Sequence, residues 1–181
     1  MSVLRLPSLP ANAGKQQWGN LPGAALSLAI AEAASNAGRF TLVLTEGSQS
    51  AERLQEELAF FAPNLPVLHL PDWETLPYDV FSPHQDIISQ RIAALYQLPQ
   101  LSRGILVVPI ATALHRLAPK RFLLGSSLVL DVGQTLDVEQ MRTRLEAAGY
   151  RCVDTVYEHG EFAVRGALID LFPMGSDTPY R

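Results

Sequence analysis

The feature that most constrains this chain of 181 residues is an alternation of helix-like segments with short apolar segments over residues 24–117. The clearest apolar segment is Gly-Ile-Leu-Val-Val-Pro at 104–109, and residues 40–45 and 67–70 have a similar character. Short apolar runs without alternating polar side chains are typical of strands buried on both faces of a parallel sheet. The sequence therefore predicts an α/β domain built on a parallel sheet.

Helices are expected between these strands. The first follows Pro22-Gly23, with Leu26, Ala29, Ile30 and Ala33 at helical spacing, and stops at Asn36-Ala37-Gly38. The second begins at a capping Ser48 or Ser50 and ends before Pro63. The apolar stripe of the second helix comprises Ala51, Leu54, Leu58 and Phe61. A third helix is expected to start at Ser82, with proline at its first position and glutamine at its third. A short fourth helix follows at 111–117.

The pattern changes after about residue 122. A strand is expected at 128–132, and Asp137 with Gln140 is a capping pair that begins a helix ending at Gly149. Three further strands are expected at Cys152–Tyr157, Phe162–Arg165 and Ala167–Phe172, with turns at His159-Gly160 and Gly166. We therefore predict an α/β domain over 1–124 and a small, truncated α+β domain over 125–181.

Composition excludes several classes of protein. With 48% hydrophobic and 18% charged residues, the chain has enough apolar side chains for a buried core and does not resemble a disordered chain. The single cysteine, Cys152, excludes an internal disulfide and a CxxC pair. There is neither a signal peptide nor an apolar run long enough to span a membrane. A cytoplasmic location without membrane contact is the expectation.

The net charge of −4 argues against nucleic-acid binding through overall charge, but the charges are unevenly placed. Residues 87–130 carry five basic and no acidic side chains, whereas the segments before and after them are acidic. Arg116, Lys120 and Arg121 lie beside His115 and could form a basic edge for phosphate, or could equally be solvated charges. If nucleic acid binds there, charge reversal at Arg116 and Lys120 must weaken binding and reduce its salt dependence.

The search for a nucleotide site is negative. A P-loop needs glycines around the phosphates, a lysine for their charge and a hydroxyl for magnesium. Before the first helix the chain instead reads Leu-Pro-Gly-Ala-Ala-Leu, so Gly23, Ala24 and Ala25 form at most a degenerate phosphate loop. We expect no bound cofactor, no catalytic residue and no enzymatic activity in this segment.

Other candidate groups are weaker. The carboxylates Asp72, Glu74 and Asp79 could serve acid/base chemistry, but they lack a nucleophile or metal partner. Glu158, His159 and Glu161 could be written as metal ligands, but a single histidine among turn residues is poor support, and no metal site is expected. Asp170 follows an apolar run as a metal-holding aspartate would, although a structural role is favoured. Trp73, Tyr78 and Phe81 are expected to anchor their loop in the core or in a neighbouring domain.

Three long strings carry a resemblance to a known family. They are Asp72–Asp79 (DWETLPYD), Phe81–Ser89 (FSPHQDIIS) and Glu158–Gly175 (EHGEFAVRGALIDLFPMG). Together they resemble the N-terminal, UvrB-like region of the bacterial transcription-repair-coupling factors (Mfd), and the last is also similar to a segment of the excinuclease subunit UvrB. The likeness covers essentially the whole chain.

The resemblance implies a helicase-like fold that has lost its nucleotide site, followed by most of a second domain. In UvrB terms these are domains 1a and 2, without domain 1b. The segment between Phe81 and Arg91 is too short for the DNA-clamping β-hairpin of UvrB, which puts strand clamping in doubt. In the whole protein, ATP and magnesium would belong to a translocase motor elsewhere in the chain. RNA polymerase and double-stranded DNA would be contacted through other domains.

The resemblance also implies a partner. Domain 2 is the family's docking surface for UvrA, the damage-recognition ATPase, and Arg165 and Arg181 match positions of that surface. The alternative is that Arg165 only pairs locally with Glu161 or Asp170. At the level of function, the main expectation is a non-catalytic module that recruits UvrA to a stalled polymerase. A nucleotide-dependent fragment of the UvrB type is the competing class, and an autoinhibitory domain is a third.

Overall fold

The computed structural model describes residues 9, 14–76, 78–125, 130 and 132–181. It contains two compact units, which we describe separately: Met1–Asp72 with Gln97–His115, and Trp73–Tyr96 with Arg116–Arg181. Among the described residues, no helix is long and apolar enough to cross a membrane.

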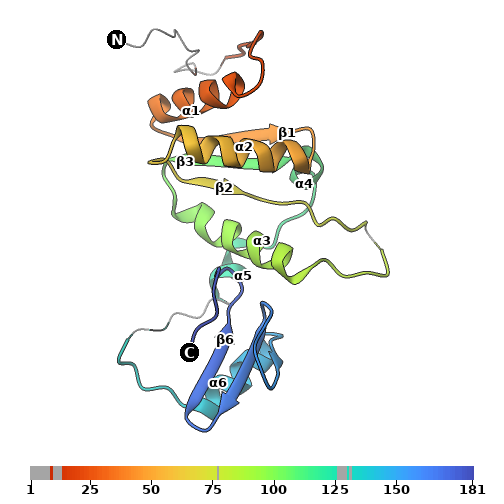
Figure 1. The fold of residues 1–181 in the computed structure, drawn as a ribbon, viewed down its shortest axis with the longest axis vertical. Coiled ribbons are helices and arrows are strands. Elements are labelled where there is room, and N and C mark those ends of the chain that lie inside the picture. Colours follow the sequence, from red (N-terminus) through yellow and green to blue (C-terminus); the bar gives the residue numbers. More distant parts are fainter. Residues whose placement is uncertain (1–8, 10–13, 77, 126–129, 131) are drawn as a thin grey trace. The chain divides into compact units, whose positions relative to one another are not determined.

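The first unit is built on a parallel sheet of β1 (Phe40–Thr45), β3 (Gly104–Pro109) and β2 (Val67–His69), in that spatial order (Figure 1). All six residues of the central strand β3 are buried, as expected for its uninterrupted apolar run. The α/β class with a parallel sheet is confirmed.

Two helices, α1 (Ala25–Ala37) and α2 (Ser48–Phe61), pack on one side of this sheet (Figure 1). Their small and branched side chains form one buried cluster with β3; its members include Ala31, Ala34, Ala51, Leu54, Leu58, Ile105 and Val107. The predicted stripe of α2 is therefore confirmed. The predicted stop at Gly38 is confirmed, and this glycine ends α1 in the left-handed conformation. The short η1 (Leu98–Gln100) precedes β3, and α4 (Ile110–Ala113) follows it.

Two predicted helix caps are wrong. Neither Ser48 nor Ser50 caps α2, which begins after Gly47, and the Ser50 hydroxyl donates to Glu46 instead. The third helix, α3 (Gln85–Gln97), begins three residues after Ser82. There the carbonyl of His84 accepts the first helical bonds and its Nδ1 accepts from the Asp86 N–H at 3.3 Å. His84 thus has the capping role that the serine was expected to fill.

The second unit contains α3, α5 (Lys120–Gly125), α6 (Val138–Ala147) and a small mixed sheet. In this sheet β4 (Arg151–Cys152) runs parallel to β5 (Glu161–Arg165), which pairs antiparallel with β6 (Leu168–Phe172). The cap of α6 is confirmed, since the Asp137 carboxylate accepts from the Gln140 N–H at 2.9 Å. The predicted strand from Cys152 to Tyr157 is wrong beyond Cys152, where the chain leaves the sheet as a loop. The strand expected at 128–132 lies mostly outside the described residues.

Helix α3 belongs to the second unit through contacts with the turn after β6. The Gly175 N–H donates to the buried Ser89 hydroxyl at 2.8 Å, and a side chain at Gly175 would meet Ala93. The units of the structure therefore interleave along the sequence. The division at residue 125 concerns family modules and stays a prediction.

Candidate partner-binding site

Arg165 and Arg181 lie on one side of the β5–β6 hairpin. Side chains alternate along a strand, so Phe162 and Val164 of β5 face α6, where Phe162 joins a buried cluster with Met141 and Leu145. Arg165 points to the opposite face, directly across from Leu168, and Asp170 of β6 shares that face because it pairs with Ala163. The register of β5 and β6 thus places Arg165 and Asp170 on the face of the sheet opposite to α6.

Arg181 reaches the same face through its neighbour. Tyr180 and Leu171 exchange two backbone hydrogen bonds of 2.8 Å, which lays the end of the chain beside β6. The Arg181 guanidinium then binds Asp170 with two nitrogens, at 2.6 and 3.0 Å. This bidentate pair matches the planar fork of arginine. Asp170 therefore has a structural partner, consistent with the role favoured for it.

The charges at this face influence one another. The pKa of Asp170 is lowered, first by its hydrogen bond from Arg181 and then by the positive charges of Arg181 and Arg165. The pKa of Arg181 is raised by the same carboxylate. Two guanidinium groups thus act on the Asp170 carboxylate.

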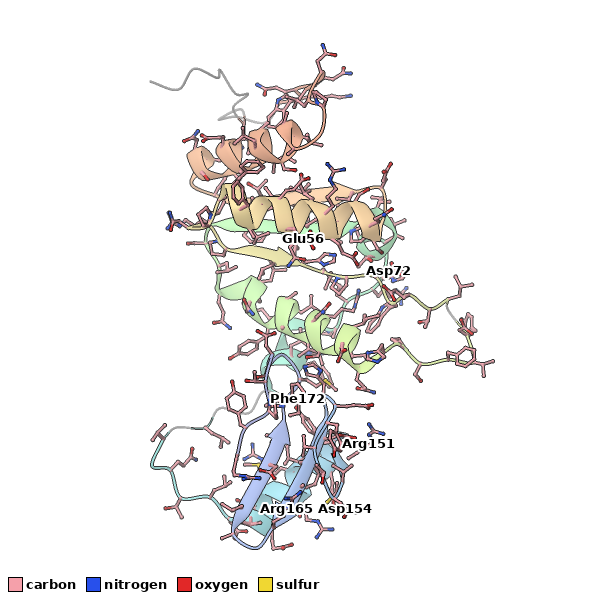
Figure 2. The ribbon with its side chains drawn as sticks, viewed as in Figure 1. Glu56, Asp72, Arg151, Asp154, Arg165 and Phe172 are labelled. Carbon is pink, nitrogen blue, oxygen red and sulfur yellow. The ribbon has the colours of Figure 1, made fainter. Side chains whose placement is uncertain are left out.

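Arg165 itself is held by the loop between β4 and β5. Its Nη2 donates to the carbonyl oxygen of Asp154 at 2.7 Å and contacts the Thr155 hydroxyl at 3.3 Å. Figure 2 shows Arg165 and Asp154 together at one end of the small sheet. The alternative of direct pairing with Glu161 or Asp170 is not what the hydrogen bonds of the described residues show, since both carboxylates bind other groups.

Glu161 was considered from the sequence as a metal ligand or as a partner of Arg165, but in the structure its carboxylate binds the backbone of the preceding loop. Its side chain is only 10% exposed, yet one carboxylate oxygen accepts from the N–H groups of Tyr157 and Glu158, each at 2.9 Å. The other oxygen accepts from Arg151 at 3.1 Å, and Arg151 also binds Glu158. The backbone bond from Tyr157 is the main reason that the pKa of Glu161 is lowered. In the sequence, the one sign of this role is that Glu161 follows the predicted turn at Gly160 and directly precedes a predicted strand.

His159 has a defined structural environment. Its Nδ1 lies 2.8 Å from an Asp86 carboxylate oxygen, its Nε2 lies 2.8 Å from the Ser176 carbonyl, and its ring packs on Phe172. Both ring nitrogens are thus occupied by protein groups. Within the described ranges, no group of three histidine, cysteine or acidic side chains is arranged to hold a metal ion.

The degenerate phosphate loop lies in the first unit. Gly23 has a positive φ of 55°, the Ala25 N–H bonds to the Pro22 carbonyl, and α1 starts after Ala24 without a side-chain cap. The nearest hydroxyl in the helix, on Ser27, is buried and donates to Glu57 of α2. This bond joins α1 to α2, and together with the ion pair to Arg53 it lowers the pKa of Glu57.

The segment 71–83 contains no helix or strand among its described residues. Asp72 accepts from the buried Thr112 hydroxyl at 2.8 Å, and Asp79 accepts from the neighbouring Val80 N–H. The Arg91 guanidinium stacks on Trp73 at 4.0 Å, whereas Tyr78 and Phe81 are exposed. Tyr78 and Phe81 therefore do not anchor the loop in a core among the described residues, and anchoring in a neighbouring domain stays a prediction.

The basic edge is accessible. Arg116, Lys120 and Arg121 are all exposed, and the last two begin α5. Contact with phosphate at this edge stays a prediction.

Comparison with known proteins places these features in a family. Residues 128–181 match the UvrB interaction domain, a stretch that includes β4, β5, β6 and both arginines. The chain is 51% identical to the transcription-repair-coupling factor of Escherichia coli over 96% of its own length, and 50% identical to that of Haemophilus influenzae over 89%. The Bacillus subtilis protein of the same name is 26% identical over 92%. The chain spans only 15%, 14% and 14% of these three relatives, respectively.

The family match and the fold agree. The parallel sheet, the small mixed sheet and the UvrB interaction domain occur in the order that the resemblance implied. The chain belongs to the transcription-repair-coupling factors, of which it represents the N-terminal, UvrB-like region.

Proposed function

We propose that this chain is a non-catalytic docking module that binds UvrA through the β5–β6 face of its second unit. The observation that carries the proposal is the placement of Arg165 and Arg181 on one face, with both charges acting on Asp170. The match of residues 128–181 to the UvrB interaction domain supports the choice of partner.

The geometry suits recognition of a carboxylate-bearing protein surface. Arg165 is held by the Asp154 carbonyl and Arg181 by the Asp170 carboxylate, so less side-chain freedom is lost on binding. Each guanidinium has five N–H donors, and these contacts leave donors available for a partner. Two guanidinium groups beside one carboxylate favour an acidic partner even though residues 131–181 carry a net charge of −4.

The role of the whole protein is part of the same proposal. In the intact factor this module recruits UvrA to a stalled RNA polymerase, while an ATP-dependent motor on double-stranded DNA displaces the polymerase. ATP and magnesium belong to that motor. The site of action is the cytoplasm, in keeping with a chain whose single cysteine is free.

A pull-down tests the docking assignment. UvrA is incubated with the immobilised chain, with the Arg165→Ala/Arg181→Ala variant, and with the chain in excess salt. We expect wild type to retain UvrA and the double variant to lose it, because both charged contacts are removed. Circular dichroism must show that the double variant is folded. Unchanged retention by a folded double variant would sink the assignment.

A second candidate is a nucleotide-dependent fragment of the UvrB type, considered because residues 128–181 match a domain named for UvrB. Calorimetry with ATP and magnesium separates the two. The docking module should release no specific binding heat, because Ala24 and Ala25 occupy the places where a lysine and a hydroxyl are needed. Saturable ATP binding that is lost on changing this segment would favour the second candidate.

A further inference from the structure

We infer that Glu161 positions the docking arginine Arg165 by fixing the loop at 153–160 that holds it. The inference rests on the proposed function, since it concerns the same docking face. Glu161 is a buried carboxylate that hydrogen-bonds neither Arg165 nor Arg181. With this role, UvrA binding depends on a buried residue as well as on the two exposed arginines.

The orientation of Arg165 depends on the loop at 153–160. Its two contacts are a backbone carbonyl of Asp154 and a hydroxyl of Thr155. A backbone carbonyl cannot rotate into place as a side chain can, so it is available only when the loop has this conformation. The orientation of Arg165 is therefore set by the backbone at 154–155.

The backbone at 154–155 is held by hydrogen bonds between the loop and β5. The loop is joined to β5 at its start by the Val153 N–H, which donates to the Phe162 carbonyl at 2.9 Å. At its other end it is joined by the Glu161 carboxylate, which accepts from the N–H groups of Tyr157 and Glu158. Asp154 and Thr155 lie between these two attachments. The Glu161 carboxylate is thus one of the attachments that hold this segment, beside the bond from its own N–H to the Glu158 carbonyl at 3.2 Å.

The hydrogen bonds of the Glu161 carboxylate to the loop are strong. An ionised carboxylate makes stronger hydrogen bonds than a neutral acceptor, and Glu161 accepts three bonds while almost fully buried. Arg151 adds a second link, because one of its nitrogens binds both Glu158 and Glu161. Removing the carboxylate leaves two N–H groups without this acceptor, which favours a different loop conformation.

The test is a double-mutant cycle on UvrA affinity with the full chain. Glu161→Met removes the carboxylate at similar side-chain length. We expect it to weaken UvrA binding about fivefold to tenfold when Arg165 is present and to have little effect in the Arg165→Ala background. Glu161→Gln, which keeps one acceptor oxygen, should fall between wild type and Glu161→Met. Glu139→Gln is the control and should bind nearly as wild type, because Glu139 is an exposed carboxylate in the first turn of α6 and not part of the loop that holds Arg165.

The outcomes separate two failures. Equal losses with and without Arg165 would overturn the positioning role and leave the docking proposal intact, since they indicate general destabilisation. No effect of Arg165→Ala itself would overturn both. If Glu161→Met does not fold, the same cycle is run with Arg151→Met, whose side chain is 59% exposed and which removes the second link. A loss that depends on Arg165 supports the inference, and a loss independent of Arg165 overturns it.

Discussion

Asp170 and Arg181 show how much a single residue depends on its neighbours in this protein. The aspartate follows an apolar run in the sequence, which is compatible with metal binding, but the bidentate contact with Arg181 occupies both of its oxygens. The sequence could not reveal this pairing, because the two residues meet only once the segment carrying Tyr180 lies beside β6. Glu161 was unpredictable for the same reason, since its partners are backbone groups of a loop.

The Asp170–Arg181 pair should make stability depend on pH. Because the folded pKa of Asp170 is lowered, the pair stabilises the protein above the ordinary aspartate range and the contribution is lost as the pH falls through the folded pKa. We expect Asp170→Asn to lower the urea midpoint near neutral pH and to approach wild type between pH about 4 and about 2. Urea titrations at several pH values measure this. The exposed Asp177→Asn is the control, and an equal pH profile for both variants would contradict the ion-pair account.

At the scale of elements, local sequence predicted the type of most helices and strands but not their first residues. The helix end at Gly38 and the cap at Asp137 follow from single residues whose chemistry suits only that position. Around α2 and α3 several residues could cap, and tertiary packing selects among them, which is why Gly47 and His84 precede these helices. The loop after Cys152 was predicted as a strand because its apolar residues resemble one, whereas the Glu161 carboxylate turns it away.

Mutation can compare the cap at Asp137, which the structure confirms, with the cap predicted at Ser48, which it contradicts. Asp137→Ala removes the oxygen that accepts from the Gln140 N–H and should lower the free energy of unfolding by about 1 kcal/mol. Ser48→Ala should change it by less than about 0.5 kcal/mol, because the Ser48 side chain does not cap α2. Chemical denaturation of both variants gives these values. A larger cost at Ser48 than at Asp137 would reverse the assignment of caps.

The start of β3 requires glycine. Gly104 has a φ of +145°, and a Cβ there would lie 2.8 Å from the backbone oxygen of Pro66, which also accepts from the Ile105 N–H. We expect Gly104→Ala to destabilise the protein by about 1–3 kcal/mol. Gly19→Ala, where a Cβ meets nothing within 4 Å, should cost less than about 0.5 kcal/mol. Equal urea midpoints for the two variants would show that the close approach to Pro66 is absent.

At the scale of the whole molecule, the sequence predicted the α/β class and the small second sheet, whereas the grouping of α3 with the second compact unit comes from the structure. Helix α3 follows the first two strands and was assigned to their domain, yet Ser89 and Ala93 contact the turn at Gly175. Such a division depends on contacts between distant segments, which periodicity does not contain. The two arginines that we propose for docking were indicated by the family resemblance, and the strand register and the Asp170–Arg181 pair place them on one face.

The measurement that tests the central claim most directly is the affinity of this chain for UvrA, by calorimetry, for wild type and two double variants of equal charge. Arg165→Ala/Arg181→Ala changes the docking face, and Arg142→Ala/Arg144→Ala changes exposed residues of α6. We predict a loss of at least about 30-fold for the first variant, as for truncated interfacial arginines, and nearly wild-type affinity for the second. Equal affinities for the two folded variants would contradict docking through the β5–β6 face.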